Sequence, residues 1–226
     1  MLRRKLYLKA KQEKAFKFYV LYDKIRLDYF LWGAYRREKA NGGALGVDRI
    51  NFDQIEKTGL PAFINSMKEA LTNRTYKAQA VRRVYIPKAN GKLRPLGIHT
   101  IRDRGAQTSC KMVIEPIFEV DFGENSYGSR PKKSTKDAMA KIKGYLKEKR
   151  THVLDADLEA YFGTIAYDKL MIAIKQRIAD KNVLGLIMQW LKSPVITAAI
   201  RQQVGRKTSR GSDLALTVKY LSELAG

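Results

Sequence analysis

Cysteine and histidine are scarce in this chain of 226 residues, which contains one cysteine and two histidines. The lone Cys110 excludes an internal disulfide and is typical of proteins from a reducing compartment. It lies among helix-forming residues, where we expect it to be buried. So small a supply of thiol and imidazole ligands also argues against a zinc site.

Long apolar runs are also lacking. The most apolar run, Val183 to Leu191, is far shorter than the ~20 residues that a membrane-spanning helix needs. The basic N-terminus is not followed by the apolar segment of a secretory signal. We therefore expect a cytoplasmic protein that does not act at a membrane.

Acidic residues are few beside the basic ones, because 22 Asp and Glu oppose 44 Lys and Arg, which gives a formal net charge of +22. Such a charge repels itself unless a polyanion is near. Nucleic acid is the first candidate, since its phosphates exchange condensed counterions for Lys and Arg, and a membrane surface is the second. The hydrophobic fraction of 45% is normal for a globular protein, which can be one large domain or two small ones at this length.

The stretch from Thr151 to Ile165 combines a short apolar run with carboxylates. Val153 and Leu154 open a run that predicts a buried strand ending on Asp155 and Asp157. Two carboxylates at the end of a strand can hold a hard divalent cation through oxygen. The alternative is that both are turn and cap residues, and spacing alone does not decide between the two.

The first part of the chain is predicted to be mostly helical. Residues 1–25 are basic with interleaved aromatic residues, and we expect a helix that ends near Asp23. It is either an RNA-contacting helix or an amphipathic helix with a solvated cationic face. A second helix over 27–40 should end at Asn41-Gly42-Gly43, residues 44–56 should form a loop, and Pro61 suits the start of a third helix.

A β-hairpin is predicted next, with strands over 81–86 and 93–98 around the turn signal Asn90-Gly91. Basic residues crowd this hairpin. Lys88 and Arg94 flank the turn, where they could close on a phosphate, the arginine in bidentate fashion and the lysine as a point charge. The alternative is that these charges protect the strands from edge-to-edge aggregation.

Further helices are predicted over 101–115, ending or kinking at Pro116, and then from Ser134, over 168–178 and over 183–192. Ser134 with Asp137 resembles a capping box, and the helix that follows has an apolar face. That face consists of Ala138, Ile142, Tyr145 and Leu146. The tail from Ser193 is assigned no element.

Several motifs follow one another along the middle of the chain: the run from Arg83 to Gln107, Glu115-Pro116-Ile117-Phe118, Tyr127-Gly128 with Arg130-Pro131, and Asp155-Ala156-Asp157. Together they resemble the N-terminal half of a group II intron-encoded reverse transcriptase and maturase. The resemblance implies an α+β fold, the fingers and palm of a right-hand polymerase, truncated, with a helical N-terminal extension. Its parts would be an RNA-binding extension over 1–78, fingers over 79–150 and an incomplete palm over 151–226.

The resemblance also implies roles for single residues. Asp157 would be the first catalytic aspartate and a ligand of Mg²⁺, to which Leu158 would lend its backbone carbonyl. Lys88 and Arg94 would reach the incoming triphosphate, and Phe162 would be the aromatic steric gate. The residues assigned to the template and primer path are Tyr127, Arg130, Arg102 and Arg104.

The chain departs from the family pattern in several places. It contains no Asp-Asp dipeptide, so the second carboxylate pair of the family is absent from these residues. Gly163 stands where the family has Asp, and Thr208-Ser209-Arg210-Gly211 where it has Thr-Pro-Gln-Gly. We therefore expect a chain that binds intron RNA, with an RNA/DNA duplex and dNTP as further candidate partners, and that does not polymerise by itself. The alternatives are a non-catalytic RNA-binding maturase-like module and an eroded, non-functional remnant.

Overall fold

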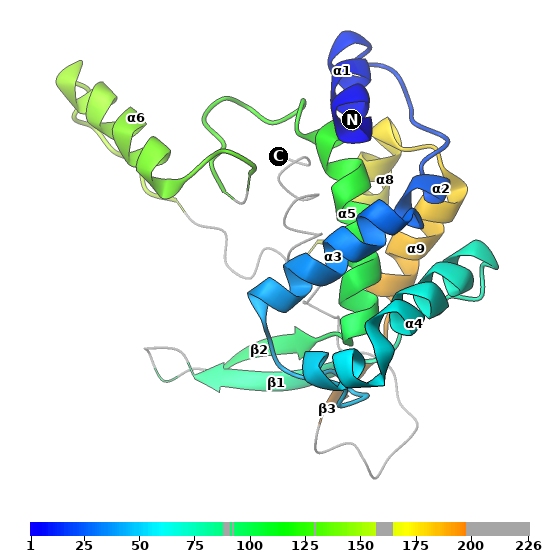
Figure 1. The fold of residues 1–226 in the computed structure, drawn as a ribbon. Coiled ribbons are helices and arrows are strands. Elements are labelled where there is room, and N and C mark those ends of the chain that lie inside the picture. The colour runs from blue at the N-terminus through cyan, green and yellow to red at the C-terminus, as the bar shows by residue number, and fades with distance from the viewer. Residues whose placement is uncertain (88–90, 92, 129, 157–164, 198–226) are drawn as a thin grey trace.

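The computed structural model describes residues 1–87, 91, 93–128, 130–156 and 165–197. Helix α5 (Ile101–Phe118) runs through the middle of the molecule, and other helices pack along it (Figure 1). Most of its side chains are buried, including Cys110, as predicted. A helix covered on most of its surface is the centre of a core, so the remaining elements are placed by their contact with α5.

The predicted N-terminal helix is shorter than expected, and the prediction was wrong beyond the end of α1 (Leu2–Gln12). The chain then continues without a long helix to the single turn α2 (Tyr22–Ile25). Between them the Phe18 N–H donates to the Arg177 carbonyl, and the Ala179 N–H donates to the Phe18 carbonyl, each at 2.8 Å. These tertiary hydrogen bonds satisfy the backbone that a continued helix would have satisfied locally.

Helix α3 (Asp28–Asn41) packs along α5 and ends at Gly42, as predicted. Gly42 has a φ of 64°, in the left-handed region that favours glycine. The buried face of α3 includes Phe30, Leu31 and Ala34. The sequence therefore placed both the helix and its end correctly.

Helix α4 (Phe52–Thr72) begins within the segment that was expected to be loop, so that prediction was wrong from Phe52 onward. The start is set by a capping box, in which Asn51 and Gln54 each accept a backbone hydrogen bond from the other, at 2.7 and 2.8 Å. The helix is kinked at Gly59, whose φ is 114°, and Pro61 follows the kink. Pro61 thus begins the second half of α4, close to its predicted place.

In the described part of the chain, one sheet has the strand order β2-β1-β3. The predicted hairpin is confirmed: β1 (Val81–Pro87) and β2 (Leu93–Ile98) pair antiparallel, with Arg82 opposite Ile98. The third strand, β3 (Val195–Thr197), pairs parallel with the beginning of β1 and was not predicted. So short a strand carries no alternation from which it could be recognised.

Helices α8 (Tyr167–Arg177) and α9 (Lys181–Leu191) correspond to the two helices predicted after residue 167. Asp180 joins them to the N-terminal region. One of its carboxylate oxygens accepts from the backbone of residues 182–183, and the other accepts from the backbone of residues 21–22. A single carboxylate therefore starts α9 and holds the beginning of α2 against it.

The core is shared between the predicted parts of the chain. One hydrophobic cluster contains Phe30 from α3, Ile114 from α5 and Trp190 from α9. The division into an extension, fingers and palm stays a prediction, and any such parts share this core.

Helix α6 (Thr135–Lys147) begins with the predicted capping box of Ser134 and Asp137. It extends away from the other helices in Figure 1, and none of its described side chains is buried. Its predicted apolar face exists, but Ile142 and Leu146 are 49% and 50% exposed. The sequence identified the face, whereas nothing in the sequence said that it would be uncovered.

The buried strand predicted to lead into Asp155 is absent. Residues 151–156 contain no strand, and the side chains of Val153 and Leu154 are 82% and 92% exposed. The physical reason is that a strand needs a neighbour to satisfy its backbone, and no described segment pairs with this one. Among the described helices, none is both long and apolar enough to cross a membrane.

Candidate nucleic-acid interface

The basic side chains of the hairpin differ in their surroundings. Arg82 is tied to the protein, because its Nε donates to the Leu45 carbonyl at 2.8 Å. Arg94 is exposed on β2, opposite Ile86 on β1. Because its side chain is exposed near the hairpin tip, Arg94 is free to contact a ligand. Lys88 lies outside the described residues.

Arg83 is a third basic residue of the hairpin, and it differs from both. It is half-buried on β1, opposite Gly97 on β2 and Thr197 on β3. Its Nε and Nη2 atoms are buried without a hydrogen-bond partner among the described residues. Buried guanidinium donors are normally satisfied, so Arg83 retains capacity for an acceptor.

The arginines assigned to the template path at the start of α5 bind the protein itself. Arg102 Nη2 donates to the Ser66 carbonyl at 3.3 Å. Arg104 Nη1 donates to the Gly42 carbonyl at 3.0 Å, and the guanidinium lies over the Phe52 ring at 5.6 Å from its centroid. Arg104 thus closes the end of α3 against α5, and its role on a template path stays a prediction.

The residues assigned to that path after α5 form a tight loop. Arg130 donates to Glu119 at 2.8 and 3.1 Å and to the Gly123 and Ser126 carbonyls at 2.6 and 2.9 Å. Only 8% of the Arg130 side chain is exposed. Tyr127 is half-buried, and Lys133 lies 5.0 Å from its ring centroid. Arg130 therefore holds this loop in shape rather than presenting its charge to solvent.

Helix α5 separates the two groups of path residues. Arg102 and Arg104 lie in its first turn, and Tyr127 and Arg130 follow its last. At 1.5 Å per residue, its 18 residues span roughly 27 Å. The structure therefore does not bring the two groups into one contact. The expected catalytic and gate residues Asp157, Leu158 and Phe162 lie outside the described residues.

More acidic than basic side chains are buried in the described part of the chain. In the described part of the chain, the buried charged side chains are Asp103, Glu115, Asp180 and Arg177. Three carboxylates are thus buried against one guanidinium, in a chain with a net charge of +22. The surface is therefore more cationic than the composition alone requires.

The chain is similar to known proteins over most of its length. Residues 86–215 match the family "Reverse transcriptase (RNA-dependent DNA polymerase)", which is more than half of the chain. The chain belongs to the reverse transcriptase family. It is 35% identical over 170 residues to the protein YkfC of Escherichia coli, covering 74% of this chain and 44% of YkfC. It is 33% identical over 196 residues to the group II intron-encoded protein LtrA of Lactococcus lactis, covering 84% and 32%.

These relatives place the chain in the family of group II intron-encoded reverse transcriptases and maturases. The chain spans less than half the length of YkfC and of LtrA. A solved structure, the "Partial Cas6-RT-Cas1--Cas2 complex", shares its fold with a TM-score of 0.57 at 18% identity, covering 90% of this chain and 33% of the other. The predicted α+β polymerase fold is thereby confirmed.

Members of the reverse transcriptase family generally use a divalent metal, which oxygen ligands hold. Asp155 is described and exposed. No group of three or more histidine, cysteine, aspartate or glutamate side chains converges within the described ranges. The metal ligands implied by the resemblance, Asp157 and the Leu158 carbonyl, are outside those ranges, so a magnesium site stays a prediction.

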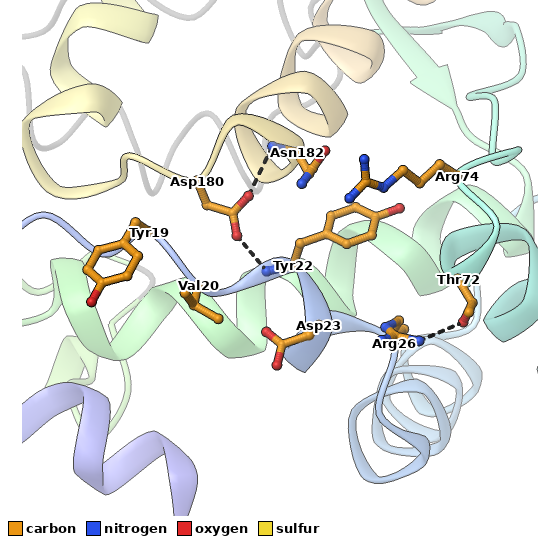
Figure 2. Close-up of a pocket in the computed structure, with 9 residues that line it drawn as sticks. All are labelled: Tyr19, Val20, Tyr22, Asp23, Arg26, Thr72, Arg74, Asp180 and Asn182. Atoms are coloured by element: carbon orange, nitrogen blue, oxygen red, sulfur yellow. Dashed lines mark hydrogen bonds between the residues drawn. The ribbon is translucent and has the colours of Figure 1, made fainter.

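The sequence did not indicate one pocket of the structure, which is formed by segments other than the hairpin. It is lined by residues from three segments, 19–26, 72–74 and 180–182, and includes Arg26 and Arg74 (Figure 2). No short motif could have indicated it, because the segments meet only through the packing of α2, α4 and α9. The signal that was present is the basic and aromatic composition of the first 25 residues.

Proposed function

We propose that this chain binds structured intron RNA through its cationic surface, as the N-terminal region of a group II intron-type reverse transcriptase and maturase. The observation that carries the proposal is the burial of three carboxylates in a chain of net charge +22, which leaves an excess of cations outside. The similarity to intron-encoded proteins makes intron RNA the polyanion to test first.

The exposed face of α1 is the part of the surface that we assign to this binding. Arg3 is committed to the protein by its ion pair with Glu115. Arg4, Lys5 and Lys11 are exposed on the same helix. A helix that uses one cation to dock and presents the others to solvent suits a phosphate backbone, which is recognised by charge rather than by sequence.

Binding should weaken steeply as salt displaces the protein from the phosphates. For a contact with six to ten phosphates, affinity is expected to fall by roughly 10³-fold or more between 50 and 200 mM salt. The measurement is a filter-binding or fluorescence-anisotropy titration with a structured intron RNA fragment. An affinity that stays flat across this range would contradict the proposal.

Paired variants locate the surface. The double variant Lys5→Gln with Lys11→Gln removes two exposed cations from α1, and Lys169→Gln with Lys175→Gln removes two from α8 as the matched control. We expect the α1 pair to lower the magnitude of the log–log salt slope by about 2, and the α8 pair to change it by less than about 0.5. Equal effects would mean that α1 is not the binding face.

For the nucleotide-handling residues we propose the roles that the resemblance implies. Lys88 and Arg94 would bind the triphosphate of a dNTP, and Phe162 would act as the steric gate. Asp157, with the Leu158 carbonyl, would hold Mg²⁺. The exposure of Arg94 at the hairpin supports its part in this assignment.

For the template and primer path we propose that some residues contact the nucleic acid and that others hold those residues in position. Tyr127 is half-buried and can contact a nucleic-acid duplex. The contacts of Arg130 with residues 119–126 support a positioning role, in which it shapes the loop that presents Tyr127. Arg102 and Arg104 would likewise act by fixing the start of α5 beside the hairpin.

We also propose that these 226 residues do not polymerise by themselves. Two divalent ions stabilise the attacking and leaving oxygens in phosphoryl transfer, and the chain contains no Asp-Asp dipeptide to complete their ligands. Primer extension with the purified chain, Mg²⁺ and dNTPs is expected to give no product above background. Robust cDNA synthesis that disappears in Asp157→Ala would overturn this proposal and leave the RNA-binding proposal intact.

A further inference from the structure

A pocket of about 250 Å³ lies where α2, the end of α4 and the start of α9 meet. We call it the Tyr22 pocket. Figure 2 shows Tyr22 in its middle, Arg74 and Arg26 toward one end, and Tyr19 at the other. It lies away from the hairpin, because α2 packs beside the middle of α5, where the Ser109 hydroxyl donates to the Ile25 carbonyl, and the hairpin lies near the start of α5 (Figure 1).

The two acidic side chains of the Tyr22 pocket are bound to protein groups, Asp180 through both carboxylate oxygens and Asp23 through one. Asp180 accepts backbone hydrogen bonds on both carboxylate oxygens, two at 2.8 Å and two at 3.0 and 3.3 Å. Asp23 forms an ion pair with Lys24 through Oδ2, and its Oδ1 is buried without a hydrogen-bond partner among the described residues. The Tyr22 hydroxyl donates to the Leu71 carbonyl at 2.8 Å. Lys24 offsets the charge of Asp23, but both carboxylates still line the pocket, so an anion would bind on the side where Arg26 and Arg74 lie.

The two guanidinium groups, in contrast, retain unused donors. Within the described part of the chain, the Arg26 side chain makes one hydrogen bond, from Nη1 to Thr72 Oγ1 at 3.1 Å. The exposed side chain of Arg74 makes no hydrogen bond or ion pair with any described residue. Two planar guanidinium groups that open onto one cavity form a site for a phosphate, which each can bind in bidentate fashion.

The two arginines also act on the same group. Burial raises the pKa of the Tyr22 hydroxyl, the positive charges of Arg74 and Arg26 oppose that rise, and the negative charge of Asp180 adds to it less strongly. Both charges therefore reach the phenol in the middle of the pocket, which agrees with their places beside it in Figure 2.

The other end of the pocket offers an aromatic surface. Tyr19 is 67% exposed, and its ring lies 6.2 Å from that of Phe16 at an angle of 47°. An exposed ring backed by another is a platform on which a nucleobase can stack, whatever the base, because every base has a π-face.

We infer that the Tyr22 pocket binds a nucleotide, with its phosphate between Arg26 and Arg74 and its base against Tyr19. The nucleotide has two sources with the same chemistry, an unpaired residue that projects from structured RNA and a free nucleoside monophosphate. Proteins recognise RNA chiefly through such unpaired, splayed-out bases. The inference goes beyond the proposed function, because it names a site on a different face from the hairpin and needs no polymerase chemistry.

Two variants test the site, and each has a matched control. Arg74→Gly removes the guanidinium at a residue with a φ of 58°, and Arg49→Gly does the same at an exposed arginine with a φ of 57° outside the pocket. Glycine favours this conformation, so both proteins should fold. Tyr19→Ala removes the stacking ring, and Tyr29→Ala removes another exposed tyrosine, which is 71% exposed.

The probes are a labelled RNA hairpin with a single bulged nucleotide, the same hairpin fully paired, and AMP. With the unaltered chain we expect the bulged hairpin to bind about tenfold more tightly than the paired one, since stacking one base contributes that much. Arg74→Gly and Tyr19→Ala should each abolish this preference, while the two controls keep it within about twofold. The chain could instead show no preference for the bulged hairpin and still bind AMP. If the two pocket variants then weaken AMP binding and the two controls do not, the pocket binds free nucleotides.

The inference is overturned if neither the bulge nor AMP is preferred, or if each pocket variant behaves like its control. Salt-sensitive RNA binding that persists under those outcomes would leave the proposed function standing. Loss of all RNA binding with AMP binding retained would contradict the proposed function and leave the nucleotide site standing. The two proposals can therefore fail separately.

Discussion

At the scale of single residues, Cys110 is the simplest reporter of the fold. It is fully buried in α5, and burial raises the pKa of its thiol from 9.0 to about 12. Because the folded pKa lies above the unfolded one, the thiol favours the folded state below pH 9, and this stabilisation is lost as the pH rises toward 12.

We therefore expect Cys110 to resist alkylation in the folded chain at pH 8 and to react fully in urea, since the thiolate is the reactive form. Labelling with iodoacetamide, followed by mass spectrometry, measures both states. The urea midpoint for labelling should match the midpoint from circular dichroism. Rapid labelling without denaturant would mean that α5 is not enclosed as described.

A buried polar network at the start of α5 gives a second prediction. Asp103 accepts from the Tyr76 hydroxyl at 2.6 Å and from the Gln79 N–H at 3.0 Å, and Trp190 Nε1 donates to Tyr76 at 2.9 Å. Burial and the Asp103 charge raise the pKa of Tyr76 well above its usual range. The network thus depends on a phenol that stays protonated and a carboxylate that only accepts.

Asp103→Asn replaces an acceptor with an amide donor that faces the Gln79 N–H or the Tyr76 hydroxyl. It is expected to lower the free energy of unfolding by about 1–3 kcal/mol. Asp168→Asn, at an exposed position of α8, is the control and should change it by less than about 0.5 kcal/mol. Urea unfolding measures both, and equal effects would show that the network adds nothing to stability.

At the scale of elements, Arg177 fastens the N-terminal helix. Its side chain is 7% exposed, with Nε 3.0 Å from Asp121 Oδ2 and Nη2 donating to the Ala10 carbonyl at 3.0 Å. A second donor reaches the Lys14 carbonyl. These carbonyls are at and beyond the end of α1, where helical partners are lacking.

Arg177→Ala should lower the free energy of unfolding by about 2–4 kcal/mol and loosen α1 before the rest unfolds, because it leaves the Ala10 and Lys14 carbonyls without their donors. Lys175→Ala, exposed on the same helix, is the matched control. Hydrogen exchange followed peptide by peptide would show faster exchange over residues 2–12 in Arg177→Ala alone. Uniformly faster exchange across the chain would contradict a local clamp.

Elements whose signals are local were predicted well. The Gly42 end of α3, the hairpin and the Ser134 capping box each depend on a few neighbouring residues, and each is confirmed. Elements set by distant partners were not. The helix expected through Phe18 is broken because its backbone pairs with the region of Ile178, and β3 exists only beside β1.

At the scale of the whole molecule, the net charge of +22 predicts how the chain responds to polyanions. Self-repulsion destabilises the compact state, and a ligand that binds the folded chain stabilises it. Heparin should raise the melting temperature by several degrees, whereas uncharged dextran at equal mass should not. Differential scanning fluorimetry measures both, and an unchanged melting temperature with heparin would argue against a cationic binding surface.

The candidate site was only partly accessible from sequence. The motifs identified the family and indicated Arg94 as an exposed cation of the hairpin. They did not indicate that Arg104 and Arg130 would be held by backbone carbonyls and Glu119, because those partners come from other turns of the chain. Motif matching assigns a residue to a region, and only packing decides whether its charge faces a ligand or the protein.

The sequence by itself determined the charge, the family, the local helix ends and the hairpin, because composition and short-range hydrogen bonding are fixed by neighbouring residues. The tertiary structure alone decided that α6 and Val153 would be exposed, that α1 would be clamped by Arg177, and that Arg26 and Arg74 would open onto one pocket. Which side chains are buried, and which come together, depends on the distant segments that pack against each other. A pattern along the sequence does not show which segments those are.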